Sequence, residues 1–263
     1  MSDSKLDEWF PKKQSYSIII GVYAGINWVP QIIDACNKQC ISPEHITLWI
    51  NRNPDATINI DTIQQKYPYL RVVWNNRNLG VYSRFSAALL DNSDRYLILD
   101  DDTIPGPNWI GNCFDTLKVV GDDAILGYRG IRLKPNALFD VEAFEKGTSE
   151  ITEVDLVGHG WFCTKKHILA MFEDAPVNNF NGEDTHLSAI NQIKYGIKTY
   201  VPKQLLSEPL TWGSTKQHLG LQPGRLSTSL GPQEHFKQRE EVNRYWLTKG
   251  WHPYYERAST SSL

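Results

Sequence analysis

The feature that most constrains the fold is a regular alternation of strand-like and helix-like segments in the first half of the chain. Short runs rich in β-branched residues are separated by segments whose apolar residues recur at helical spacing. The pattern predicts strands at 15–23, 45–52, 70–76, 95–100 and 124–130, and helices at 28–39, 62–67, 79–92 and 108–120. Strands that alternate with helices in this way pair in parallel, and the helices cover both faces of the sheet. We therefore expect an α/β fold with a mostly parallel central sheet.

The alternation stops after Arg132. The following segments are predicted as a polar, irregular surface excursion at 133–151, then a strand, a glycine-rich turn, a short strand and a helix within 154–172, an amphipathic helix at 181–196 and a late strand at 197–202. The tail from Ser207 is rich in Gly, Pro, Ser, Gln and His, and it ends in a predicted helix at 232–250. We expect one domain over 1–263, with halves at about 15–130 and 131–206 and a tail at 207–263.

Composition excludes several classes of protein. A formal net charge of −3 gives no general attraction to nucleic acid or to anionic membranes, so no nucleic-acid partner is expected. The first residues, MSDSKLDEWFPKKQ, lack the basic-then-apolar order of a signal peptide, and no apolar run is long enough to span a bilayer. The four cysteines show neither metal-type spacing with histidine nor a dense disulfide pattern. We expect a cytoplasmic protein in a reducing compartment, without a membrane span.

Three consecutive carboxylates, Asp100, Asp101 and Asp102, directly follow the fourth predicted strand in YLILDDDTIP. In an open parallel sheet, ligands bind beyond the carboxyl ends of the strands. Neighbouring carboxylates at such a position offer oxygen ligands to a hard divalent cation and leave other metal positions for substrate phosphates. The alternatives are a solvated acidic turn, or a helix cap formed by Asp102. The position at a strand end favours the cation site.

An ordered set of segments resembles the GT-A-fold glycosyltransferases. The segment YLILDDDTIPGPNWI looks like their DxD element, GVYAGIN matches the strand end that meets the nucleotide base, and NRNLGVYSRFSAAL matches the segment before the DxD strand. Downstream, VGHGWFCTKKHI and NGEDTHLS resemble the acceptor-side glycine and aromatic element and the acidic motif that opens a helix. The set covers some 70% of the chain, from Ser17 to Pro202. The resemblance implies that 15–130 binds a nucleotide sugar, that 131–206 is the acceptor and catalytic half, and that the tail is a candidate lid.

Two branches share these motifs. The triple Asp and the SRF segment are similar to the exostosin-type hexosaminyltransferases, which retain anomeric configuration. The NLG and GED elements are equally similar to the large inverting family that includes the cellulose and chitin synthases. Processive members of that family carry a QxxRW motif, and this sequence has none. We therefore expect non-processive transfer, with either anomeric outcome.

The resemblance also implies a donor and a cofactor. The donor would be a nucleotide-diphosphate sugar, with UDP favoured, and Mn²⁺ or Mg²⁺ across its phosphates would act as a Lewis acid. Asp102 would be the main metal ligand, and Asp100 would bind the metal or hydroxyls of the donor. The other candidates for nucleotide-sugar binding are Asp101, Val22, Tyr23, Asn51, Arg77, Asn78 and Arg84. Arginine suits phosphate oxygens, although a surface ion pair is the alternative for each of the two arginines.

The acceptor side carries the remaining candidates. By the family pattern Asp184 would be the general base that accepts the proton of the acceptor hydroxyl, with Glu183 as the nearest alternative. A helix N-terminus also favours acids through its dipole. The turn around His159, Gly160 and Trp161 would contact the acceptor or the donor sugar. His218 in the tail is a candidate for a further metal ligand, with His235 as its alternative, and a solvated histidine is the other interpretation of both.

Two other functions compete with a hexosyl- or pentosyltransferase that acts on a glycan or other hydroxyl acceptor. A nucleotidyltransferase acting on sugar phosphates would favour a basic, glycine-rich loop after the first strand, and GVYAGINWVP contains no lysine or arginine. A non-catalytic sugar- or calcium-binding module would need neither Asp184 nor Arg84. The sequence therefore favours the transferase.

Overall fold

The computed structural model describes residues 15–55, 57–135, 137–215 and 232–260. The strands in these residues are β1 (Tyr16–Val22), β2 (Ile46–Asn51), β3 (Arg71–Asn75), β4 (Arg95–Asp100), β5 (Ile125–Lys134), β6 (Ala137–Phe144), β7 (Thr152–Val154), β8 (Leu156–Thr164) and β9 (Thr199–Val201). The helices are η2 (Ile26–Trp28), α1 (Val29–Asn37), α2 (Ile60–Lys66), η3 (Val81–Leu90), α3 (Trp109–Val120), α4 (Lys165–Met171), α5 (Glu183–Tyr195), η4 (Pro209–Thr211), α6 (Pro232–Thr248) and α7 (Tyr254–Thr260).

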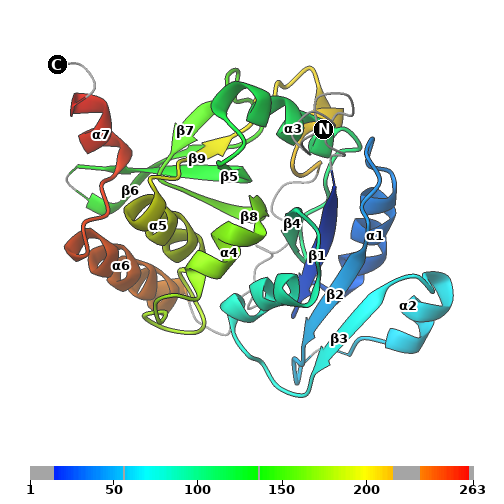
Figure 1. The fold of residues 1–263 in the computed structure, drawn as a ribbon. Coiled ribbons are helices and arrows are strands. Elements are labelled where there is room, and N and C mark those ends of the chain that lie inside the picture. Colours follow the sequence, from blue (N-terminus) through cyan, green and yellow to red (C-terminus); the bar gives the residue numbers. More distant parts are fainter. Residues whose placement is uncertain (1–14, 56, 136, 216–231, 261–263) are drawn as a thin grey trace, which may run out of the picture.

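The strands form one mixed sheet in the order β3-β2-β1-β4-β8-β5-β9-β7, with β6 paired to β5 (Figure 1). The first four strands of this order are parallel, as the alternation in the sequence predicts. β8 is antiparallel to both of its neighbours and separates β5 from β4. β9 is again parallel to β5, and β7 is antiparallel to β9. The expectation of an α/β fold with a mostly parallel sheet is confirmed.

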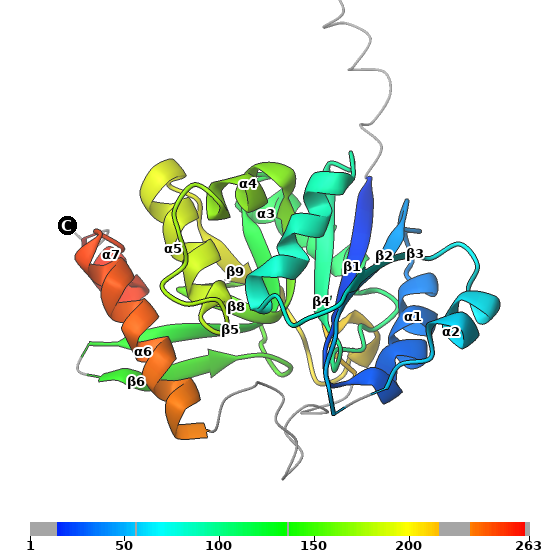
Figure 2. The same ribbon diagram turned by 90° about the horizontal axis from the view of Figure 1, so that it is seen from below.

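Helices cover both faces of the sheet (Figure 2). Side chains alternate between the two faces of a strand, so neighbouring residues of β1 join different clusters. Ile18 and Ile20 pack with α1 and α3 on one face. Ile19 packs with Phe85 of η3 and Ile168 of α4 on the other face. This double coverage explains why β1 and β2 are buried along nearly their whole length.

A third apolar cluster joins the C-terminal helices to the β5–β8 side of the sheet. Val242 and Trp246 of α6, together with Trp251, pack against Leu156 of β8 and Ile190 of α5. The predicted helix at 232–250 is confirmed as α6. Figures 1 and 2 both show α6 and α7 beside β6, far from α1 and α2.

Three segments differ from expectation. The excursion expected at 133–151 contains β6, which pairs with the extended end of β5 and supplies hydrogen-bond partners that this edge needs. The turn expected near Gly158 is part of the continuous strand β8, and its glycines accompany a register irregularity opposite Gly127 and Arg129. The helix expected at 79–92 is a 3₁₀ helix, in which the hydroxyls of Ser83 and Ser86 donate to carbonyls three residues earlier.

In the described part of the chain, no helix has both the length and the apolar character needed to cross a bilayer.

Candidate functional site

The candidate site forms where β1 and β4 end beside the middle of β8. Gly21 of β1 is in register with Asp100 of β4, so the loop after β1 lies beside the acidic triplet. β8 runs antiparallel to β4 with Leu99 opposite Gly160, which brings His159 next to Asp100. The topology therefore joins the triplet to the glycine and aromatic element, two motifs that are almost 60 residues apart in the sequence.

Asp100, Asp102 and His159 form a group that could hold a metal ion. One potential ligand atom from each lies within 4.8 Å of the others. The Nδ1 atom of His159 is 3.9 Å from Oδ2 of Asp100 and 4.0 Å from Oδ1 of Asp102. Burial lowers the pKa of His159, but the two carboxylates outweigh it and leave this pKa raised. Burial likewise acts to raise the pKa of Asp102, but the adjacent His159 outweighs it and lowers the pKa.

The backbone at His159 is constrained. Its φ of 62° is the only positive value at a non-glycine position in the described chain. Glycines flank it on both sides, and Thr103 Oγ1 donates a hydrogen bond to its carbonyl oxygen at 2.8 Å. Left-handed backbone at a non-glycine residue is costly and tends to occur at functional sites. His159, expected from its sequence to contact the acceptor or the donor sugar, lies beside Asp100 and Asp102.

Asp101 shapes the loop after β1. Its Oδ2 atom accepts hydrogen bonds from the backbone N–H groups of Tyr23, Ala24 and Gly25, at 2.7, 2.9 and 2.7 Å. A Cβ atom on Gly25 would lie 2.3 Å from the carbonyl oxygen of Asp101, so only glycine allows this approach. Burial, reinforced by the charge of Asp102, raises the pKa of Asp101 to about 6, although the backbone donors oppose the rise. The middle carboxylate of the triplet thus holds the predicted nucleotide-base loop in place.

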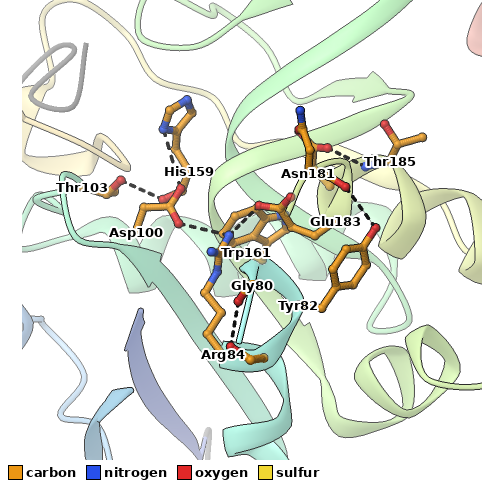
Figure 3. Close-up of polar contacts among 12 residues, drawn as sticks. Gly80, Tyr82, Arg84, Asp100, Thr103, His159, Trp161, Asn181, Glu183 and Thr185 are labelled. Carbon is orange, nitrogen blue, oxygen red and sulfur yellow. Dashed lines mark hydrogen bonds and ion pairs between the residues drawn. The ribbon is translucent and has the colours of Figure 1, made fainter. Parts of the chain in front are cut away.

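Arg84 joins the triplet to the acidic motif (Figure 3). Its Nη2 atom lies 3.1 Å from Oδ1 of Asp100 and 2.7 Å from Oε1 of Glu183. Its guanidinium lies over the ring of Trp161, 4.8 Å from the ring centroid. Its side chain also passes Gly21, where a Cβ atom would lie 2.5 Å from the Arg84 Cδ atom. Arg84, expected from its sequence to face phosphate, pairs with two carboxylates.

These buried charges are unequally balanced. Burial raises the pKa of Asp100, and the charge of Arg84 opposes this rise. Burial also raises the pKa of Glu183, with the charge of Asp184 adding to the effect and Arg84 again opposing it. One guanidinium therefore serves two partly buried carboxylates, and both carboxylates take up a proton more readily than in water.

The acidic motif opens α5. Gly182, with a φ of 82°, precedes Glu183 and Asp184 in the first turn of the helix. Oδ1 of Asp184 accepts a hydrogen bond from the backbone N–H of Thr185 at 2.8 Å. A Cβ atom on Gly158 would lie 3.6 Å from Oδ2 of Asp184, so this carboxylate faces β8 one residue before His159. Asp184 also forms an ion pair with Arg239 of α6, a partner that the sequence analysis did not identify.

The other predicted nucleotide-site residues surround the loops at this edge. Asn51 Nδ2 donates to Asn78 Oδ1 at 3.4 Å and to the carbonyl oxygen of Gly80 at 3.2 Å. These two asparagines hold the segment before η3 against the end of β2. Val22 is buried, and Arg77 is exposed in the turn after β3.

The remaining acceptor-side and tail candidates do not lie together. Gly160 is buried within β8, and Trp161 is 1% exposed, with its indole N–H donating to the carbonyl oxygen of Val157 at 2.7 Å. The buried ring of Trp161 therefore packs against the guanidinium of Arg84. His218 lies outside the described residues. His235 contacts Asn181, whose Nδ2 lies 3.1 Å from His235 Nδ1, and it is not part of the group that could hold a metal.

A scan against protein-family models gave no match, and no curated protein sequence matched the chain. Among solved structures, S. aureus TarS is similar in fold, with a TM-score of 0.51 and 11% sequence identity over 74% of this chain. The match covers 37% of the TarS chain, so this protein spans little more than a third of that length. Identity this low shows the fold alone. The similarity is consistent with a GT-A fold.

Proposed function

We propose that the protein is a metal-dependent, non-processive glycosyltransferase. It moves a hexosyl or pentosyl group from a nucleotide-diphosphate sugar, with UDP favoured, to a hydroxyl of a glycan or another acceptor. The observation that carries the proposal is the convergence of a two-carboxylate and histidine group with an acidic helix N-terminus at one edge of a GT-A sheet. The similarity in fold to TarS, a glycosyltransferase, supports the same function.

The group formed by Asp100, Asp102 and His159 fits a divalent cation. It offers two carboxylate oxygens and one imidazole nitrogen within 4.8 Å of one another. Mg²⁺ takes oxygen ligands almost exclusively, so the imidazole favours Mn²⁺ of the two expected ions. When bound, the ion would offset the charge of the departing nucleotide diphosphate.

The protein's own residues would perform the remaining steps. Asp184 would accept the proton of the acceptor hydroxyl, with Glu183 as the alternative. The loop held by Asp101 would contact the base through Tyr23, with Val22 buried at the end of β1 beneath the loop. Asn51 and Asn78 would hold the segment before η3. Arg77, which is exposed, would reach the phosphates, whereas Arg84 would set the position of Asp100.

The metal assignment predicts that nucleotide binding depends on a divalent cation. Calorimetry with UDP should show tight binding with Mn²⁺ and weak binding with EDTA. Asp102→Ala should remove most of the difference, because it deletes the carboxylate that faces His159. Asp115→Ala is the matched control, since this carboxylate is exposed and pairs only with Lys118 in the described residues. Equal affinity with EDTA would contradict the assignment.

The base assignment predicts that Asp184→Asn leaves UDP binding with Mn²⁺ nearly intact and abolishes most of the sugar transfer. The substitution keeps the size of the side chain and removes the group that accepts the proton. General base catalysis contributes about 10²–10⁴-fold, and turnover should fall by that factor. Near-normal turnover would exclude Asp184 as the base and leave Glu183. The anomeric configuration of the product, read by NMR, separates the inverting from the retaining course.

A further inference from the structure

Helix α6 contacts the acidic motif almost residue by residue. Its contacts with the segment 181–186 are spaced along one face of the helix. Asn181 Nδ2 donates to the carbonyl oxygen of His235 at 2.8 Å, Thr185 Oγ1 donates to Asn243 Oδ1 at 2.8 Å, and the rings of His186 and Trp246 lie 5.0 Å apart. A Cβ atom on Gly182 would lie 2.6 Å from Val242, so this glycine allows the helix to approach. One face of α6 therefore packs along the acidic motif.

Arg239 lies in the middle of this contact and neutralises one of three neighbouring acids. Glu183 and Asp184 are adjacent in the first turn of α5, and Asp100 lies on the other side of Arg84 from Glu183. Arg84 pairs with Asp100 and Glu183. Asp184 is the remaining acid, and its ion-pair partner is Arg239. The two arginines approach the acids from different elements, η3 and α6.

The contacts also fix the orientation of the Asp184 carboxylate. One oxygen accepts the backbone N–H of Thr185, and the other pairs with Arg239. A carboxylate oxygen has two lone pairs, so each oxygen keeps one free for a further donor. The side chain of Asp184 is only 11% exposed, and that of Arg239 is 29% exposed, so the pair lies at the margin of the site. An acceptor hydroxyl would meet a carboxylate whose direction is already set.

We propose that Arg239 is a positioning residue that holds Asp184 in one orientation for proton transfer from the acceptor. This proposal rests on the proposed function, because it assigns Arg239 a role through the proposed general base. It also gives α6 a role in the reaction, although Arg239 lies 55 residues from Asp184 in the sequence.

The kinetic test compares Arg239→Gln and Arg239→Lys with the wild-type protein. Loss of orientation at a reacting group costs up to about 10²-fold, so Arg239→Gln should lower kcat by about 10- to 100-fold. The donor KM should stay within about threefold, because the metal group is untouched. Arg239→Lys keeps the charge and should recover part of kcat. Arg244→Gln is the matched control, since Arg244 is on the same helix, is 65% exposed and pairs with Glu240.

A double-mutant cycle separates positioning from a general structural role. If Arg239 acts through Asp184, Arg239→Gln should have no further effect on kcat in the Asp184→Asn background. If Arg239 only stabilises the fold, its effect should be the same in both backgrounds. Equal effects, or a rise in donor KM as large as the fall in kcat, would overturn the proposal.

A second cycle needs no substrate. Urea unfolding of the wild-type protein, both single variants and the double variant should be non-additive, because the two residues are in contact. Additive free energies would overturn the proposal whatever the activity. If the wild-type protein transfers no sugar from any nucleotide sugar, the proposed function fails, and the unfolding cycle still decides whether Arg239 holds Asp184.

Discussion

Arg84 is the residue on which the charge balance of the site depends. Its side chain is 11% exposed and shares one guanidinium between Asp100 and Glu183. If Arg84 were removed, Asp100 and Glu183 would remain partly buried without a counter-charge. Breaking a buried pair by removing one partner typically costs about 3–5 kcal/mol, far more than losing a surface pair.

We therefore predict that Arg84→Met lowers the free energy of unfolding by about 3–5 kcal/mol at neutral pH. Urea denaturation is the measurement. The loss should shrink at acid pH, because protonation removes the repulsion between the two carboxyls. Arg244→Met should cost less than about 1 kcal/mol, since its pair is at the surface. A similar loss for both variants would show that Arg84 is not a buried counter-ion.

At the residue scale, the sequence singles out individual residues better than it predicts which of them meet. Asp100, Asp102 and His159 were all singled out, because a strand end and a glycine-flanked turn have local signals. Their grouping was not predicted, since it depends on the antiparallel pairing of β8 with β4. Arg239 has no local signal at all: it is one of several charged residues on a polar helix, and only tertiary packing selects it.

At the element scale, α4 begins with a pH-sensitive cap. Thr164 Oγ1 accepts the backbone N–H of His167, and His167 Nδ1 accepts the backbone N–H of Thr164, each at 3.3 Å. Its other nitrogen, Nε2, lies 2.9 Å from Asp123 Oδ1. This reciprocal cap requires a neutral imidazole, because a protonated Nδ1 cannot accept a hydrogen bond. Burial lowers the pKa of His167 from 6.5 to about 4, although Asp123 opposes the change.

The sign of the pH effect follows from this lowered pKa. In the unfolded chain His167 binds a proton below about pH 6.5, whereas in the folded protein it stays neutral down to about pH 4. Protons therefore favour the unfolded state in this window, and stability should fall as the pH falls from 6.5 to 4. The pKa difference corresponds to about 3 kcal/mol.

The test is the free energy of unfolding measured between pH 7 and 4. His167→Gln should flatten this part of the curve, because glutamine can also accept the N–H of Thr164 but does not titrate. His252→Gln, at an exposed histidine, is the control. An unchanged slope in His167→Gln would assign the acid sensitivity to other groups.

The elements themselves were predicted where one period persists long enough. β1 to β4 and the helices between them have clear apolar patterns, and all are present. β6 was missed because strand pairing with β5, rather than its own composition, makes it a strand. The sequence predicts a turn within β8, because glycines usually end a strand. Here Gly158 and Gly160 flank His159. Gly127 of β5 allows the close approach of Val157, whose Cβ lies 2.3 Å from the place that a Cβ on Gly127 would take.

At the scale of the whole molecule, the sheet is continuous but the core is not uniform. Two clusters cover the faces of the parallel half, and a third is built from α5, β8 and the C-terminal helices. Tail residues before α6 are hydrogen-bonded to the loop between β4 and α3. Gly106 N–H donates to the carbonyl oxygen of Trp212, and Thr215 N–H donates to that of Ile104, each at 2.8 Å. The segment 216–231, which the lid hypothesis needs, lies outside the described residues. The sequence could not predict the third cluster, because its partners are far apart in the chain.

The third cluster links stability to the acidic motif, and Trp251 is the residue that tests this link. Its side chain is 1% exposed and packs in the same cluster as Trp246, Val242 and Ile190. Removing a buried tryptophan side chain costs about 3–5 kcal/mol, so Trp251→Ala should lower the free energy of unfolding by that amount. Trp74→Ala is the control, since Trp74 is 44% exposed on β3 and its loss should cost about 0.5 kcal/mol.

Hydrogen exchange shows where this stability is lost. In Trp251→Ala, exchange should rise most in α6 and in residues 181–190, because the cluster holds α6 against α5. Exchange in β1 and β2 should change less, since their side chains belong to the other two clusters. If the proposed function holds, turnover should then fall further than UDP binding, because α6 carries Arg239 whereas the group that could hold a metal ion lies at the end of β4 and on β8. A uniform rise in exchange over all strands would show that the sheet unfolds as one unit and that α6 has no separate control over the acidic motif.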